Sequence, residues 1–182
     1  MIDSQHKAVI TVDGLSASYG DKKVLDNVSF RVFQGEIFVV VGASGCGKST
    51  LLKYLIGLYR PKTGKVMVQD FDLGTADDEQ LQRFKAGIGV LFQSSALIGS
   101  MTLRENIALP LRHHTDLPPD MIDMIVKMKL ELVNLSGYED YLPSELSGGM
   151  RKRAGLARAM AMDPTILFFD EMSAGLDPVT AV

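Results

Sequence analysis

The chain has 182 residues, 46% of them hydrophobic, which is enough for one domain, or for one core with a subdomain. Its formal charge of -3 gives no electrostatic reason to expect nucleic-acid binding. No apolar run approaches the ~18 residues that span a bilayer, and the polar N-terminal residues Met1–Lys7 lead us to expect no signal peptide. The single cysteine, Cys46, excludes an internal disulfide and suits a reducing compartment.

The first part of the chain is predicted to form strands joined by short turns. Apolar and β-branched residues favour a strand over residues 8–12, and alternating polarity favours another over 24–33, with a turn at 19–23 between them. We expect this opening to pair antiparallel. The apolar run 36–41 is predicted to be a different kind of strand, buried at the centre of a parallel sheet.

The segment after this run matches the pattern G-x-x-x-x-G-K-[ST] at every fixed position. It precedes a predicted helix over residues 51–56, and a strand, glycine loop and helix in this order form a phosphate cradle. Backbone N–H groups and the positive end of the helix would face the phosphates. Lys48 would neutralise the β- and γ-phosphates, and the Ser49 hydroxyl would bind Mg²⁺. The alternative is a glycine-rich turn with an exposed lysine. The predicted nucleotide contacts are Gly42, Ala43, Ser44, Gly45, Cys46, Gly47, Lys48, Ser49 and Thr50.

The middle of the chain mixes short strands with helices. Residues 60–64 are expected to end the loop helix, and strands are predicted over 65–69 and 88–92, the second of which leads into Gln93. A helix is predicted over 77–85, with Asp77 or Asp78 as its N-cap.

From Thr102 to Ser136, helical signals dominate. Thr102 and Glu105 form the pattern of a capping box, Pro110 is expected to close that helix early, and 116–120 is a break. Apolar residues at helical spacing follow, and we interpret them as core packing rather than as a docking face. These residues are Met121, Ile122, Ile125, Met128, Leu132 and Leu135. We expect a helical insertion over about 94–162 within one domain covering residues 1–182.

Near the C-terminus, a helix is predicted to open at Leu146-Ser147-Gly148-Gly149-Met150, with Met150, Ala154, Ala157 and Ala161 on one face. A strand over 165–169 then leads into Asp170-Glu171. A carboxylate at the carboxyl end of a buried strand lies where doubly wound sheets bind ligands. We predict that Asp170 holds Mg²⁺ and that Glu171 polarises the attacking water as a general base. The alternative is two acidic residues that cap a turn.

Taken in order, these motifs resemble those of the ABC-type ATPases, and the resemblance runs from about Ala8 to the end of the chain. Leu146-Ser147-Gly148-Gly149 resembles the signature motif of the family, Tyr19 its adenine-stacking aromatic residue, and Gln93 its Q-loop glutamine. Residues 173–177 resemble its D-loop. The resemblance implies an α/β P-loop NTPase fold with a mainly parallel central sheet, an antiparallel N-terminal β subdomain and an inserted helical subdomain.

The resemblance also implies roles, cofactors and partners. Ser147, Gly148, Gly149 and Met150 would contact the nucleotide of a second copy, in a homodimer around two ATP. Lys48, Gln93 and Glu171 would be the catalytic residues, with Ser49, Gln93 and Asp170 as Mg²⁺ ligands. Transmembrane permease subunits are implied partners, with the protein peripheral on the cytoplasmic face of a bacterial inner membrane. The alternatives are a packing role for Tyr19, a strand-end polar role for Gln93 and an ordinary N-cap at Ser147.

Three stretches resemble more narrowly the ATPases of lipid-asymmetry transporters, bacterial systems that move phospholipid across the envelope. They are 91–97, 105–111 and 146–153, the last with Met150 where most members have Gln. Four basic residues of the helix after 146 are interpreted as a solvated face rather than as a site for lipid headgroups or partner acids. They are Arg151, Lys152, Arg153 and Arg158.

The sequence departs from the family pattern at two points. Met172 replaces the proline usual after the catalytic glutamate, and the histidines, His6, His113 and His114, all lie upstream of where the switch histidine of the family belongs. We therefore expect a C-terminally truncated part of a longer ATPase. The expected function is the ATP-binding subunit of an ABC transporter. The alternatives are a nucleotide-binding fragment without efficient turnover and a soluble ABC protein of DNA repair or translation.

Overall fold

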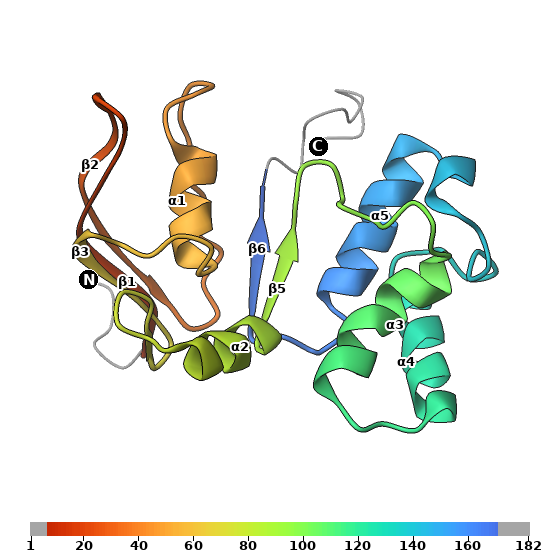
Figure 1. Ribbon diagram of the computed structural model, residues 1–182. Helices are drawn as coiled ribbons and strands as arrows, with labels where there is room; N and C mark the ends of the chain where they lie inside the picture. The colour runs from red at the N-terminus through yellow and green to blue at the C-terminus, as the bar shows by residue number, and fades with distance from the viewer. Residues whose placement is uncertain (1–6, 171–182) are drawn as a thin grey trace. The chain divides into compact units, whose positions relative to one another are not determined.

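A computed structural model describes residues 7–170, which form two compact units that divide after Lys85 (Figure 1). The first unit contains β1 (Ala8–Tyr19), β2 (Lys22–Phe33), α1 (Lys48–Leu55), β3 (Thr63–Val68), β4 (Phe71–Asp72) and α2 (Asp78–Ala86), whose last residue crosses the division. The second contains β5 (Ile88–Leu91), α3 (Leu103–His114), α4 (Pro119–Leu132), the short 3₁₀ helix η1 (Pro143–Glu145), α5 (Gly148–Ala159) and β6 (Ile166–Phe169).

The first unit is built on an antiparallel sheet with strand order β2-β1-β3-β4. β1 and β2 form a hairpin in which Tyr19 pairs with Lys22, and Gly20 in the turn has φ 56°, which glycine adopts without strain. β1 also pairs with β3, and Val12, Leu15 and Val66 are among its buried side chains. The predicted antiparallel opening is confirmed, with strands longer than expected.

At one position of this sheet, β1 and β3 approach so closely that only glycine fits. Gly64, at the start of β3, has φ 81°, and a Cβ on it would lie 2.4 Å from the carbonyl carbon and oxygen of Gly14. Because real Cβ atoms do not approach backbone atoms so closely, only glycine allows β3 to reach β1 at this point.

The strand predicted over 36–41 is wrong. No ladder among the described residues includes this run, and its side chains are exposed, Ile37 to 92% and Val41 to 89%. Only Phe38 makes a ring contact, stacking on Phe30 with 5.0 Å between centroids. A strand is stabilised by hydrogen bonds to a neighbour, so an apolar run with no paired neighbour stays irregular.

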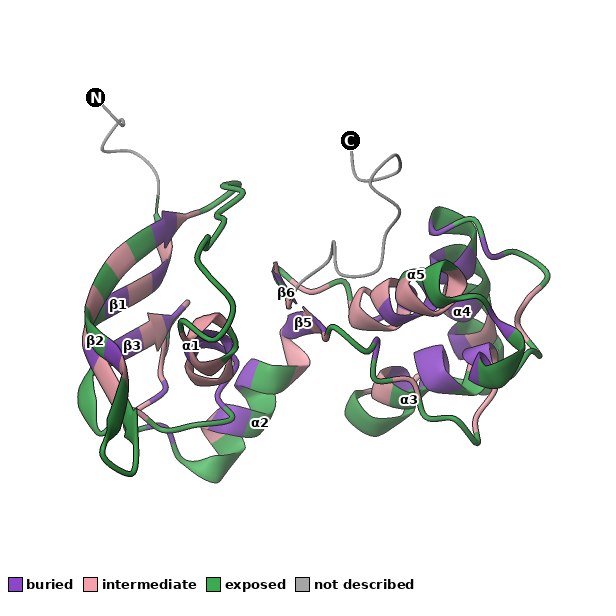
Figure 2. Ribbon diagram, turned by 90° about the horizontal axis from the view of Figure 1, so that it is seen from above, coloured by how far each residue is buried: buried purple, intermediate pink, exposed green. Residues whose placement is uncertain are grey.

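The second unit combines a parallel strand pair with packed helices. β5 and β6 are parallel neighbours, with Leu91 opposite Phe169 (Figure 1). Helices α3, α4 and α5 share one core, and Figure 2 shows buried positions on each of them. Fully buried members of this core include Leu103, Ile107, Val126, Leu130 and Ala154. The mixed α/β fold class predicted from the sequence is confirmed.

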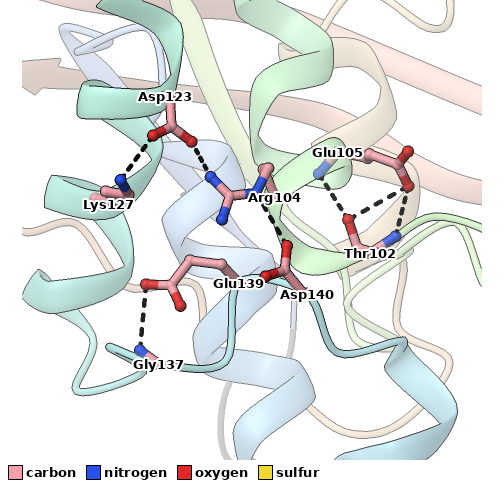
Figure 3. Close-up of polar contacts among 8 residues, drawn as sticks. All are labelled: Thr102, Arg104, Glu105, Asp123, Lys127, Gly137, Glu139 and Asp140. Carbon is pink, nitrogen blue, oxygen red and sulfur yellow. Dashed lines mark hydrogen bonds and ion pairs between the residues drawn. The ribbon is translucent and has the colours of Figure 1, made fainter. Parts of the chain in front are cut away.

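Polar contacts hold the ends of these helices (Figure 3). The Thr102 hydroxyl accepts from the Glu105 N–H at 3.2 Å, and Glu105 Oε2 accepts from the Thr102 N–H at 2.8 Å, so the predicted capping box is confirmed. Arg104 on α3 pairs with Asp123 on α4 and, at 3.1 Å, with Asp140. Ion pairs this exposed contribute at most about 1 kcal/mol each.

Pro110 does not close its helix early, as the sequence predicted. α3 continues through Pro110 to His114. A proline ring inside a helix removes one hydrogen bond, but the buried side chains of Ile107, Ala108 and Leu111 hold the helix against its neighbours on both sides of the proline.

The prediction that the periodic apolar residues from Met121 to Leu135 are all core is wrong in part. Ile122 and Leu135 are buried and Ile125 packs against the same core. Met121, Met128 and Leu132 are exposed, because α4 contacts α3 and α5 along one face only. Among residues 7–170, no helix combines the length and the apolar character needed to cross a membrane.

Candidate nucleotide site

The glycine loop lies directly before α1, in the first unit. Gly45 has φ 77° and Gly47, the N-cap of α1, has φ 105°, both in the region that favours glycine. A Cβ on Gly47 would lie 3.0 Å from the Val24 carbonyl oxygen, and one on Gly42 only 2.6 Å from Cys46 Sγ. Backbone conformation and lack of space therefore both favour glycine at position 47, whereas a Cβ at position 42 would meet only the movable end of the Cys46 side chain.

Lys48 lies across this loop. Its ammonium group donates to the carbonyl oxygens of Gly42 at 2.9 Å and Ala43 at 3.0 Å, with Cys46 Sγ at 4.0 Å. The first turn of α1 contains no acidic residue, and no side chain caps its N-terminus. A cation surrounded by a loop at the positive end of a helix attracts anions, so the donors present here fit a phosphate group.

Tyr19 lies next to the end of this loop. Hydrogen bonds from the hydroxyl groups of Tyr59 first and Thr50 second lower the pKa of Tyr19, and the positive charge of Lys53 adds to this. Tyr19 is 51% exposed, as a residue that stacks on a planar ligand would be. Tyr54 and Tyr59 meet edge to face with 5.6 Å between centroids, and the Lys53 ammonium lies 5.5 Å from the Tyr59 ring. The structure thus brings Tyr19 and Thr50 together.

The sequence analysis did not predict that Tyr59 and Lys53 lie beside Tyr19 and lower its pKa. Both follow the loop closely in the sequence, and Lys53 falls one turn after Ser49 on α1. Their nearness to Tyr19 depends on the pairing of β1 with β3, which brings the end of β1 beside the segment between α1 and β3.

In the second unit, Gln93 and Asp170 lie at one edge of the parallel pair. Gln93 follows the end of β5 by two residues, Asp170 directly follows β6, and the Asp170 N–H donates to the Leu91 carbonyl at 2.9 Å. This edge is the carboxyl end of both strands, where open α/β sheets bind ligands. The predicted Mg²⁺ set also includes Ser49 of the first unit, and the full set stays a prediction.

The signature-like segment begins α5. The Ser147 hydroxyl accepts from the Met150 N–H at 3.2 Å, and Gly148 and Gly149 form the first turn. No Cβ added to Gly149 would meet another atom within 4 Å among the described residues, so this helix end is open. Glu171, Met172 and the D-loop-like segment 173–177 lie outside the described residues.

The solvated face that the sequence predicted for the basic residues of α5 is wrong in part: Arg153 is exposed, but Arg151 and Arg158 are partly buried. Arg151 donates to the Leu146 carbonyl, Arg153 donates to the carbonyls of Val133 at 2.9 Å and Asn134 at 3.0 Å, and Arg158 donates to two further carbonyls. Planar guanidinium groups bind several backbone oxygens at once. The spacing could have predicted the burial of Arg158, because Arg158 falls on the same helical face as the buried Ala154 and Ala161.

A family model described as ABC transporter matches residues 25–174, and the chain belongs to this family of ATP-binding cassettes. Over 94% of its length it superposes with a TM-score of 0.85 on a solved dimeric structure of the ATP-binding cassette MJ0796 bound to ADP and Pi, at 28% identity and 77% coverage of that chain. The predicted family resemblance is confirmed.

Two curated relatives are similar over almost the whole chain. The probable ribonucleotide transport ATP-binding protein mkl of Mycobacterium leprae is 47% identical over 93% of this chain and 49% of its own length. The intermembrane phospholipid transport system ATP-binding protein MlaF of Haemophilus influenzae is 42% identical over 94% of this chain and 65% of its own length. The chain therefore spans about half to two thirds of the length of these relatives.

Proposed function

We propose that the complete protein is the ATP-binding subunit of an ABC transporter, which couples binding and hydrolysis of MgATP to transport. The observation that carries this proposal is the loop before α1. Gly45 and Gly47 have positive φ there, and Lys48 at the helix N-terminus donates its ammonium to the Gly42 and Ala43 carbonyls. The family membership and the cap of α5 at Ser147 support the same function.

Each residue of the site has its own part in this function. The loop Gly42–Thr50 would hold the phosphates, Lys48 would counter charge that develops on them, and Tyr19 would stack on the adenine ring. Ser49, Gln93 and Asp170 fit a hard cation because each presents an oxygen ligand, and Mg²⁺ bound there would neutralise phosphate charge. Glu171 would orient and deprotonate the attacking water.

The proposed partners follow from the same set of residues. Ser147, Gly148, Gly149 and Met150 begin a helix with an accessible N-terminus, which would contact the nucleotide bound by a second copy. The dimeric structure of MJ0796 supports such a homodimer. Transmembrane permease subunits, and a place on the cytoplasmic face of a bacterial inner membrane, complete the proposal. Residues 94–162 would form the helical subdomain of a single domain over residues 1–182.

We propose phospholipid as the transported substrate class. The stretches 91–97, 105–111 and 146–153 and the similarity to MlaF of Haemophilus influenzae support it. The name of the mycobacterial relative provides a second candidate, a ribonucleotide. Mass spectrometry of molecules that co-purify with the membrane-extracted complex would separate the two, because a phospholipid and a ribonucleotide differ in mass and in solubility.

The test uses the complete protein with MgATP. Lys48→Ala should weaken binding of a fluorescent ATP analogue at least tenfold, a change of about 1.4 kcal/mol. Glu171→Gln should keep the binding and stop the turnover, because only its role toward water is lost. Normal turnover in Glu171→Gln would remove that residue from the mechanism, and unchanged binding in Lys48→Ala would overturn the proposal.

The 182-residue chain itself should be assayed beside the complete protein. The second candidate function is nucleotide binding with little turnover, which predicts a lower steady-state ATPase rate for this chain than for the complete protein. Equal steady-state rates in the two would show that this expectation is wrong.

A further inference from the structure

Residues 93–102 join β5 to α3. Side chains on α3 and α5 that belong to none of the nucleotide-site motifs bind the backbone of this segment. We call it the glutamine segment because it begins with Gln93. At its first turn, Ser95 has φ 64° and Ala96 has φ 49°, in the region that side-chain-bearing residues rarely adopt. Backbone in this conformation persists only where its surroundings hold it.

Arg158 on α5 is the group that holds this turn. Its Nη1 donates to the Ala96 carbonyl at 2.8 Å, and its Nη2 donates to the Ser95 carbonyl at 3.0 Å. One planar guanidinium thus binds the carbonyls of both left-handed residues. Among the residues that the structure describes, no ion pair includes Arg158, so carbonyl dipoles and not a carboxylate face its charge. Burial lowers the pKa of this guanidinium from its ordinary value.

The fit between α5 and the glutamine segment leaves no room at Gly155. A Cβ there would lie 2.9 Å from Leu91 Cδ1, 3.0 Å from Ser95 Cβ and 3.1 Å from the Ser95 carbonyl oxygen. The turn therefore rests directly on α5, one helical turn before Arg158. Ser95 is buried there, although Gln93, two residues earlier, is exposed.

Asn106 on α3 holds the other half of the segment. Its Oδ1 accepts from the Ile98 N–H at 2.8 Å and lies 3.4 Å from Arg158 Nη1. Its Nδ2 lies 3.0 Å from the carbonyl oxygens of both Met101 and Thr102. Asn106 and Arg158 thus form one hydrogen-bonded network that fixes the segment at both of its turns.

We propose that Arg158 is a positioning residue that fixes the backbone two residues after Gln93 and so orients the Gln93 side chain toward the nucleotide-bound metal ion. This proposal rests on the proposed function. Arg158 lies eleven residues after Ser147 on α5, about 16 Å along the helix axis. The same helix that presents Ser147 therefore also carries the group that holds Gln93, and the two ends of α5 are joined rigidly.

Arg158→Lys in the complete protein is the primary test. Lysine keeps the charge but cannot present two coplanar donors to two carbonyls. Arg153→Lys is the matched control, since Arg153 lies on the same helix and also donates to two carbonyls, one of which belongs to Asn134 with φ 54°. Thermal unfolding of both variants shows how far each is destabilised.

Turnover separates positioning from stability. We expect Arg158→Lys to lower kcat about tenfold, to raise the Mg²⁺ concentration for half-maximal rate at least threefold, and to leave the KM for ATP within twofold. Arg153→Lys should stay within twofold of the wild type in all three. Equal losses in the two variants, or no change in the Mg²⁺ dependence of Arg158→Lys, would overturn the proposal.

A double-substitution cycle provides the second test. If Arg158 acts through Gln93, Arg158→Lys should lower kcat by less than twofold in a Gln93→Ala background, whereas a purely structural role predicts the same tenfold loss in both backgrounds. Should Arg158→Lys fail to fold, Arg158→Gln takes its place in the cycle, because an amide retains two N–H donors. A wild-type protein that binds and hydrolyses no ATP would instead contradict the proposed function.

Discussion

Replacing Asn106 by alanine is expected to destabilise the protein more than most single substitutions. The side chain is fully buried and has no access to water, and all its polar atoms are occupied. Its Oδ1 accepts from the Ile98 N–H, and its two amide hydrogens are shared among the carbonyls of Ile98, Met101 and Thr102 at 3.0–3.1 Å. The alanine side chain has no polar atom to replace any of these hydrogen bonds.

The magnitude follows from the hydrogen bonds that alanine cannot form. The two amide hydrogens form hydrogen bonds that contribute about 0.5–1.5 kcal/mol each, and leaving the buried Ile98 N–H without its partner costs about 1–3 kcal/mol. The carbonyls tolerate the substitution better, because an oxygen can accept from another donor or from water that enters the space. We therefore expect Asn106→Ala to lower the free energy of unfolding by about 3–5 kcal/mol, which corresponds to a Tm lower by roughly 10 °C.

Urea unfolding followed by circular dichroism measures this difference, with Arg112→Ala as the control. Arg112 lies on α3 like Asn106 but is exposed, so its replacement should change the unfolding free energy by no more than about 0.5 kcal/mol. A decrease below about 1 kcal/mol for Asn106→Ala would refute the reasoning, because it would mean that the glutamine segment does not depend on this amide.

Three further outcomes can be measured on the same protein. Gly64→Ala should lower the free energy of unfolding in urea by at least about 3 kcal/mol, because its φ of 81° and a 2.4 Å clash with Gly14 act together. Gly20→Ala, with φ 56° and open space, should cost only about 1 kcal/mol, so similar costs would contradict the close approach of β3 to β1. Thr102→Ala should cost about 1 kcal/mol by loss of the α3 cap and Thr102→Ser close to none, so equal losses would speak against the capping box. Because the pKa of Tyr19 is lowered, its phenolate forms at lower pH than usual. Tyr19→Phe should therefore remove the tyrosinate absorbance that develops below the ordinary pKa of about 10. An unchanged ultraviolet titration would exclude the contacts of Tyr19 with Tyr59 and Thr50.

The sequence alone determined the features that depend on residues close together in the chain. The capping box at Thr102 and Glu105 joins residues three apart, the hairpin turn at Gly20 needs only one glycine in the right place, and the loop from Gly42 to Thr50 is defined by its own pattern. These features form through local backbone conformation and local hydrogen bonds, so the residue types at a fixed spacing suffice to predict them.

Only the tertiary structure decided features that need a distant partner. The run 37–41 has the composition of a buried strand yet pairs with no described strand, and α3 passes through Pro110 because its buried neighbours hold it. The hydrogen-bond partners of Arg158 are the clearest case, since the two carbonyls lie more than sixty residues earlier in the chain. Composition shows that a guanidinium needs acceptors, but the packing of α5 against the glutamine segment decides which acceptors it meets.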